Sequence, residues 1–125
     1  MFKVTSTPNA PAAIGPYSQA ICANGILFAS GQIALDPATG EVCGTTIEEQ
    51  AERCCQNVKG ILEANGLTFE DVVKTTCFLA DMKDFAAFNG VYAKYFTGKP
   101  ARSCVAVAGI PKGLLCEIEI TAICK

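Results

Sequence analysis

Three charged residues near the C-terminus have types and a spacing that could bind a small acid. Arg102 opens one apolar run, and Glu117 and Glu119 alternate with isoleucines in a second run. A guanidinium can hold a carboxylate through two parallel hydrogen bonds, and a nearby glutamate can orient water or move a proton. These residues predict an anion clamp. The alternative is a purely structural ion pair between Arg102 and Glu119.

We expect the two runs, over 102–110 and 114–123, to pair as a hairpin. Because side chains alternate between the faces of a strand, Arg102 would then share one face with Glu117 and Glu119. In that hairpin Arg102 and Glu117 lie about four positions apart, or ~13 Å, so one chain's pair does not close a small-molecule site. The prediction is therefore a site between subunits.

A second wall is predicted from an earlier hairpin. Asn24-Gly25 is typical of a type I′ turn, because both central positions of that turn need a positive φ, and strands are expected over 17–23 and 26–33. Pairing across the turn places four polar side chains on one face: Tyr17, Gln19, Ser30 and Gln32. For an isolated tyrosine, packing with a solvated hydroxyl is the commoner role.

The remaining elements must position these residues. Apolar residues recur at helical spacing between 47 and 62, after a Thr46–Glu49 capping box, and we expect Gly66 to end this helix. We expect a strand over 72–80 and a second helix over 81–96, which contains Asn89. The order is ββαβαββ, with room for an extra strand at 2–6. This order predicts an α+β fold in which two helices pack on one face of a single mixed sheet.

The other face of that sheet is predicted to be apolar. The strand over 102–110 alternates Ser103, Val105 and Val107 with Cys104, Ala106 and Ala108. Two helices cover only one face, and a bare apolar face implies a partner, most simply copies of the same chain. We therefore expect a homo-oligomer.

Composition limits the class of protein. The 125 residues are 50% hydrophobic and 18% charged, which predicts one folded domain over 1–125. A net charge of −2 with scattered Lys and Arg argues against a nucleic-acid-binding surface. No apolar run is long enough to cross a membrane. Without histidine, histidine bases and histidine-ligated metals are excluded. The start of the sequence lacks the pattern of an export signal, so we expect a cytoplasmic protein.

The eight cysteines have no C-x-x-C spacing, and most of them occupy positions suited to a small apolar side chain. We expect reduced, buried thiols that act as small hydrophobes, rather than a disulfide framework. A zinc site has no supporting spacing.

Four segments together resemble the RidA (YjgF, or endoribonuclease L-PSP) family of enamine/imine deaminases. They are Gly15–Ala20, Ser30–Ile33, Pro100–Val105 and Glu117–Glu119, and the resemblance runs over nearly the whole chain. It implies a chorismate-mutase-like α+β subunit and a homotrimer with three sites at subunit boundaries. The implied reaction is hydrolysis of 2-aminoacrylate and 2-aminocrotonate, or their imines, to 2-oxo acids and ammonia, without cofactor or metal.

The resemblance also implies roles for individual residues. Arg102 would bind the substrate carboxylate, and Glu117 would position the hydrolytic water. The other implied substrate-binding residues are Tyr17, Ser30, Gly31, Asn89 and Cys104, with Cys104 lining the site rather than acting as an obligatory nucleophile. The segment 96–100 is shorter than is usual before this arginine, which bears on pocket shape.

Two other functions fit the same residues. One is an endoribonuclease or translation inhibitor, which the acidic charge balance and the lack of histidine disfavour. The other is a trimer that binds small ligands without turnover.

Overall fold

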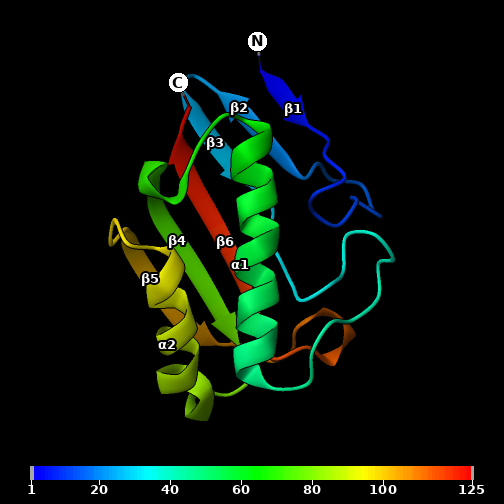
Figure 1. Ribbon diagram of the computed structural model, residues 1–125, viewed down its shortest axis with the longest axis vertical. Helices are drawn as coiled ribbons and strands as arrows, with labels where there is room; N and C mark the ends of the chain where they lie inside the picture. Colours follow the sequence, from blue (N-terminus) through cyan, green and yellow to red (C-terminus); the bar gives the residue numbers. More distant parts are fainter. Residues whose placement is uncertain (1, 125) are drawn as a thin grey trace.

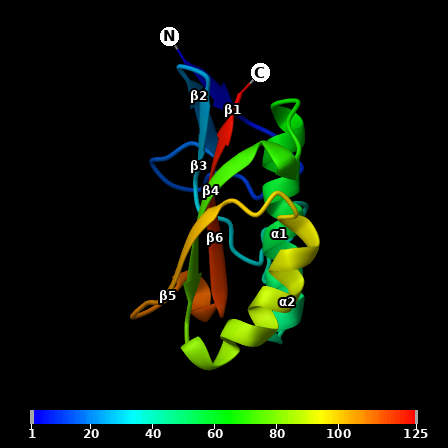
Figure 2. The ribbon, with the colours of Figure 1, turned by 90° about the vertical axis from the view of Figure 1, so that its left-hand side faces the viewer.

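A computed structural model describes residues 2–124 of the chain. One six-stranded sheet carries two helices on one face, which is clearest when the sheet is viewed edge-on (Figures 1 and 2). The elements are β1 (Lys3–Thr5), β2 (Ala20–Ala23), β3 (Ile26–Ala29), α1 (Ile47–Ala64), β4 (Val72–Leu79), α2 (Phe85–Tyr95), β5 (Ala101–Ala106) and β6 (Cys116–Ile123). The predicted α+β fold, with one mixed sheet and both helices on one side, is confirmed, and the N-terminal strand is present.

The first hairpin forms in the predicted register. Ala20 pairs with Ala29 and Ala23 pairs with Ile26. Asn24 and Gly25 have φ values of 52° and 75°, as a type I′ turn requires. The relative placement of the residues that flank this hairpin could therefore be predicted from the sequence.

The predicted C-terminal hairpin is wrong. The strand order is β1-β2-β3-β6-β4-β5, so β6 lies between β3 and β4, while β5 forms an edge and pairs only with β4. The physical reason is the connection through α2, because a helical crossover returns the chain parallel to the strand that it left. β5 accordingly runs parallel to β4, and β6 is antiparallel to β4.

This order changes the face on which Arg102 lies. Thr75 of β4 is opposite both Arg102 of β5 and Ile120 of β6, and Thr75 and Ile120 are buried beneath the helices. Arg102 therefore shares the helix-covered face. Glu117 and Glu119 alternate with the buried Ile118 and Ile120, so they occupy the open face. The expectation that Arg102 shares a face with the two glutamates is wrong.

α1 begins and ends as predicted. Thr46 Oγ1 accepts a hydrogen bond from the Glu49 amide (3.2 Å), and the Glu49 carboxylate accepts one from the Thr46 amide (3.1 Å). Gly66, just beyond the helix, has a φ of 70°. Neither α1 nor any other helix within residues 2–124 has the length and apolarity to cross a membrane.

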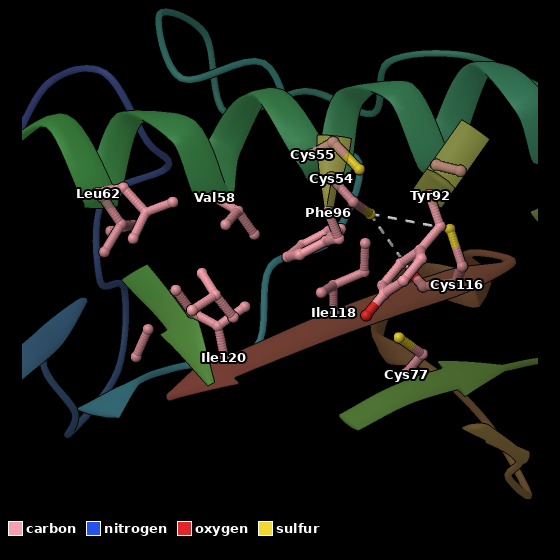
Figure 3. Packing of buried hydrophobic residues seen from close by; sticks show 14 of the residues in the cluster. Cys54, Cys55, Val58, Leu62, Cys77, Tyr92, Phe96, Cys116, Ile118 and Ile120 are labelled. Atoms are coloured by element: carbon pink, nitrogen blue, oxygen red, sulfur yellow. Dashed lines mark hydrogen bonds between the residues drawn. The ribbon is translucent and has the colours of Figure 1, made fainter. Parts of the chain in front are cut away.

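Cysteines make up part of the core between α1 and the sheet (Figure 3). Cys54 and Cys55 of α1, Cys77 of β4 and Cys116 of β6 are fully buried, which confirms the prediction for these four. Burial raises the pKa of the Cys77 thiol to about 12, so this thiol stays protonated at neutral pH.

Cys22 and Cys124 correct the prediction of reduced thiols. They form a disulfide between β2 and the residue after β6, with Cα atoms 6.7 Å apart. β2 and β6 lie on either side of β3 in the sheet, and the predicted topology did not place them there.

The open face carries exposed apolar side chains, as predicted, together with the glutamates of β6. Four residues on it are each about half exposed: Val4, Phe28, Val105 and Ile123. Part of the loop between β1 and β2 lies on the same side, away from the helices (Figure 2).

Candidate functional site

A cavity of about 720 Å³ lies on the open side of the sheet. Its walls come from the loop before β2, the segment after β3, the turn before β6 and β6 itself. Predicted site residues that line it are Tyr17, Ser30, Gly31 and Glu117. Gln19 and Gln32, which were predicted to share a face with Tyr17 and Ser30, line it as well, and so does Glu119. All four residues of the predicted polar wall thus line one cavity, but Gln32 pairs with Ile118 of the helix-covered face, so the prediction that Gln32 shares a face with Ser30 is wrong.

One buried glutamine holds the loop that carries Tyr17. Gln19 Nε2 donates to the carbonyl oxygens of Thr7 and Pro11, at 3.0 and 2.9 Å, and Gln19 Oε1 accepts from the Thr7 amide at 2.7 Å. These bonds tie the incoming loop to the start of β2, because Gln19 immediately precedes that strand. Tyr17, whose side chain is half exposed, is thereby placed at the cavity wall.

Gly31 makes room for the Glu117 side chain. A Cβ atom at position 31 would overlap the Glu117 carboxylate and come within 2.7 Å of its Cδ. The backbone next to Gly31 is fixed to the neighbouring strand, since Gln32 and Ile118 exchange two backbone hydrogen bonds of 2.8 and 3.0 Å. The carboxylate therefore lies directly against the backbone at residue 31. Ser30, just before it, donates its hydroxyl to the Ser18 carbonyl at 2.6 Å.

The Glu117 carboxyl group is harder to ionise than an ordinary one. Its burial raises the pKa above the ordinary value of 4.5, and the negative charge of Glu119 raises the pKa further. Such a group can accept a proton from water and return it to a leaving group, because its affinity for the proton is higher than that of an exposed carboxylate.

Asn57 is a supporting residue that the sequence reading missed. It is fully buried in α1, and its Nδ2 donates to the carbonyl oxygens of Ile33 and Leu35 at 2.9 and 3.0 Å. Both Ile33 and Leu35 line the cavity. The available signal was an asparagine inside the apolar stripe of a helix, where it has to hydrogen-bond to something.

Arg102 lies in a different environment, between β5 and α2. Its Nη1 donates to Asn89 Oδ1 at 2.7 Å, and its guanidinium lies against the aromatic rings of Tyr92 and Phe85. No ion pair with Arg102 occurs within residues 2–124, so the alternative of a structural pair with Glu119 is wrong. The positive charge of Arg102 is therefore left without an acidic partner among residues 2–124.

Cys104 lies two residues along β5 from Arg102 and on the same face. Burial raises the pKa of its thiol, and the positive charge of Arg102 opposes that rise. The raised pKa favours the protonated thiol, which is a weak nucleophile. This environment suits a residue that lines a site.

The predicted site residues thus form two groups that one chain does not bring together. Tyr17, Ser30, Gly31 and Glu117 share the cavity, whereas Arg102 and Cys104 lie on β5 at the sheet edge and Asn89 lies on α2 beside Arg102. Along β4 the partners of Arg102 and Glu117 are three positions apart, or about 10 Å, and the two side chains point to opposite faces.

A metal centre has no support from this arrangement. Among residues 2–124, no cluster of three or more Cys, Asp or Glu side chains could hold a metal ion. The chemistry available at the two groups is that of a guanidinium, a carboxyl group with a second one beside it in the cavity, hydroxyls, an amide, a thiol and backbone groups.

Comparisons of sequence and of structure relate this chain to the same group of known proteins. Residues 7–124 match the sequence profile of the Endoribonuclease L-PSP family. The mouse protein named 2-iminobutanoate/2-iminopropanoate deaminase is 47% identical over 122 residues, covering 97% of this chain and 90% of the mouse protein.

Solved structures agree with the sequence match. The Rid-family protein YyfA from Yersinia pestis superposes with a TM-score of 0.95 at 47% identity, covering 98% of this chain and 99% of that one. TdcF from Escherichia coli, solved with bound serine, superposes with a TM-score of 0.93 at 42% identity, with coverage of 98% and 99%.

Proposed function

Because the chain belongs to the Endoribonuclease L-PSP family, we propose that it is a 2-iminobutanoate/2-iminopropanoate deaminase. Its substrates are 2-aminoacrylate, 2-aminocrotonate and their imine tautomers, and its products are 2-oxo acids and ammonia. The observation that carries the proposal is a guanidinium with no acidic partner among the residues that the structure describes, on a chain whose cavity is lined by a carboxyl group of raised pKa. The mouse relative, named for this activity, supports it.

In the proposed reaction Arg102 binds the substrate carboxylate through paired hydrogen bonds. Glu117 accepts a proton from a water molecule, whose oxygen bonds to the imine carbon while the C=N π electrons move to nitrogen. Glu117 then returns the proton to the amino group. As the C–N bond breaks, Glu117 passes the hydroxyl proton to the departing nitrogen, so ammonia leaves and the C–O bond becomes the carbonyl of the 2-oxo acid. Catalysis here rests on orientation and a placed water, since the imine carbon is already electrophilic.

The two residue groups act together in this proposal across a contact between two copies of the chain. Arg102, Asn89 and Cys104 of one copy face Tyr17, Ser30, Gly31 and Glu117 of the next, and three copies close a ring. The half-exposed apolar residues of the open face support such an assembly, because burying them removes apolar surface from water. The serine bound to TdcF, a small amino acid with a carboxylate, fits the proposed ligand class.

The test is ammonia release from a threonine dehydratase reaction, with and without this protein. We expect the protein to accelerate the decay of the released enamine and imine, and Arg102→Ala to lose at least about 100-fold of that acceleration, because the carboxylate loses its bidentate partner. Lys94→Ala is the matched control, since it removes an exposed cation that lies away from both groups. No acceleration by the wild-type protein would refute the proposal.

Two outcomes would favour the other readings. Tight binding of 2-oxobutanoate without ammonia release would indicate a ligand-binding protein. RNA cleavage lost in Arg102→Ala would indicate the endoribonuclease for which the family is named. The cavity disfavours RNA, because Glu117 and Glu119 would repel a phosphodiester. The cytoplasmic location stays a prediction, which cell fractionation tests.

A further inference from the structure

The surroundings of Arg102 on α2 are mostly aromatic. The guanidinium carbon lies 4.8 Å from the centroid of the Tyr92 ring and 5.5 Å from that of the Phe85 ring, within the range of cation–π contacts. Phe85, Asn89 and Tyr92 are spaced i, i+4 and i+7, so all three lie on one face of the helix. One helical stripe therefore supplies two rings and one amide to the same guanidinium.

The Tyr92 ring is itself held in place. Its hydroxyl is 2.7 Å from Thr75 Oγ1, in a hydrogen bond that is buried. Thr75 is the direct neighbour of Arg102 across the β4–β5 pairing, so the hydroxyl is anchored beside the strand position that carries the arginine. Phe96 stacks on the Tyr92 ring, with centroids 4.3 Å apart and ring planes 17° from parallel. Tyr92 points from α2 toward the sheet (Figure 3).

This arrangement restricts the guanidinium without consuming its donors. A guanidinium has five N–H donors, and within the described chain Arg102 uses one of them, to Asn89. Aromatic faces attract the positive charge and accept no in-plane hydrogen bond, so the remaining N–H groups stay available. An arginine that is already oriented loses less side-chain entropy when a carboxylate binds.

From this geometry we propose that Tyr92, anchored by Thr75, is a positioning residue for Arg102. With Phe85, it orients the guanidinium for bidentate binding of the substrate carboxylate. The inference rests on the proposed function for the identity of the substrate. Its physical content is narrower, namely that the affinity for a carboxylate depends on a tyrosine that touches the arginine and not the ligand.

The experiment measures steady-state kinetics with 2-iminobutanoate generated in the assay, and calorimetric binding of 2-oxobutanoate and of its uncharged amide. We expect Tyr92→Leu to raise the KM and the Kd for 2-oxobutanoate about tenfold, as expected for a lost desolvated cation–π contact. The change in kcat should be much smaller, and binding of the amide should be unchanged. A purely structural role would weaken both ligands alike.

The anchoring hydrogen bond is tested separately. Tyr92→Phe and Thr75→Val each remove one partner, so each should raise the KM about two- to threefold, and the double variant should do no more than either alone. Tyr92→Phe keeps the ring and should restore most of the affinity that Tyr92→Leu loses. In an Arg102→Lys background, Tyr92→Leu should have little further effect on the KM, because lysine does not form the bidentate contact.

Tyr95 provides the matched control. It lies on the same helix, its hydroxyl accepts a hydrogen bond from Gln56 at 2.8 Å, and its ring packs on Phe69 rather than on Arg102. Tyr95→Leu and Tyr95→Phe should therefore leave the KM and the carboxylate Kd unchanged. Equal effects of the substitutions at positions 92 and 95, or an unchanged carboxylate Kd in Tyr92→Leu, would overturn the inference. A wild-type protein that binds 2-oxobutanoate but turns over no imine would instead refute the proposed function.

Discussion

Glu117 occupies a position that makes its ionisation unfavourable, and this sets an expected pH dependence. Burial and the charge of Glu119 both raise its pKa. In the proposed reaction Glu117 must be ionised to accept a proton from water. The kcat/KM should therefore rise with pH on a limb whose midpoint lies above 4.5.

The two causes of this raised pKa can be separated by substitution. Glu119→Gln removes the like charge but leaves the burial of Glu117, so the acid limb of kcat/KM should move to lower pH while activity at neutral pH is kept. Glu117→Gln should abolish the limb together with most of the activity. An acid limb that does not move in Glu119→Gln would contradict this account. Glu48→Gln, at an exposed position in the first turn of α1, is the control.

The raised pKa of Glu117 also affects the free energy of unfolding. The folded state binds the Glu117 proton more tightly than the unfolded chain does, so the free energy of unfolding falls as pH rises through the window between 4.5 and the raised value. Glu117→Gln should therefore raise the free energy of unfolding at pH 7, and the difference should shrink as pH falls below that window. A catalytic carboxylate that lowers stability is a common trade at functional sites.

Some residue placements could be predicted from the sequence, and others could not. The common position of Tyr17, Gln19 and Ser30 at the cavity agrees with the parity of one short hairpin, whereas Gln32 pairs with Ile118 beyond the end of that hairpin. The contacts of Arg102 with Tyr92 and Phe85 do not, because they depend on how α2 lies over the sheet. Gly31 was assigned to the site only by resemblance, and its steric relation to Glu117 needs the three-dimensional register.

α1 contributes to the site through one buried amide. Asn57→Ala should lower the free energy of unfolding by about 2–4 kcal/mol, because two buried backbone carbonyls lose their donor. It should also raise the KM, since Ile33 and Leu35 form a cavity wall. Chemical denaturation and kinetics measure the two effects.

The neighbouring Gln56 is the matched control for Asn57. It lies on the same helix and is half buried, and it donates to the Tyr95 hydroxyl rather than to the cavity wall. Gln56→Ala should therefore cost about 1 kcal/mol or less and leave the KM unchanged. If Asn57→Ala behaves like Gln56→Ala, the amide is not what holds the wall.

The main error at the scale of elements was a strand order. The short turn at 111–113 favoured a hairpin between the last two strands, but the α2 crossover places β5 beside β4 and leaves the centre of the sheet for β6. β6 alternates buried and less buried residues, as expected for a strand with one face under the helices and the other face open. The alternation of side chains predicts which residues share a face when two strands are paired as neighbours. It gives a wrong answer when the two strands are not neighbours in the sheet.

At the scale of the whole molecule, the two residue groups imply how copies associate. One chain presents Arg102 at its β5 edge and Glu117 on its open face, which are different surfaces. A contact that joins two different surfaces is heterologous, and it closes only as a ring. The proposed trimer satisfies that condition with three equivalent contacts.

A mixing experiment tests this arrangement directly. Arg102→Ala and Glu117→Gln subunits should each be nearly inactive alone. After dissociation and equal mixing, one contact in four combines an intact Arg102 with an intact Glu117, so about a quarter of the wild-type activity should return. Mixing that restores no activity, although mixed oligomers are seen by native mass spectrometry, would show that each site lies within one chain.

The hollow at residue 31 has a consequence for how this sequence can diverge. Because a methyl group there would occupy the volume of the carboxylate at 117, 86 positions along the chain, any larger residue at 31 requires that flexible side chain to move from its place in the cavity. In a library randomised at both codons, substitutions at the first should therefore survive selection for folding but not selection for the proposed activity, because the carboxylate is displaced. Active variants that keep Glu117 should then keep Gly31 as well.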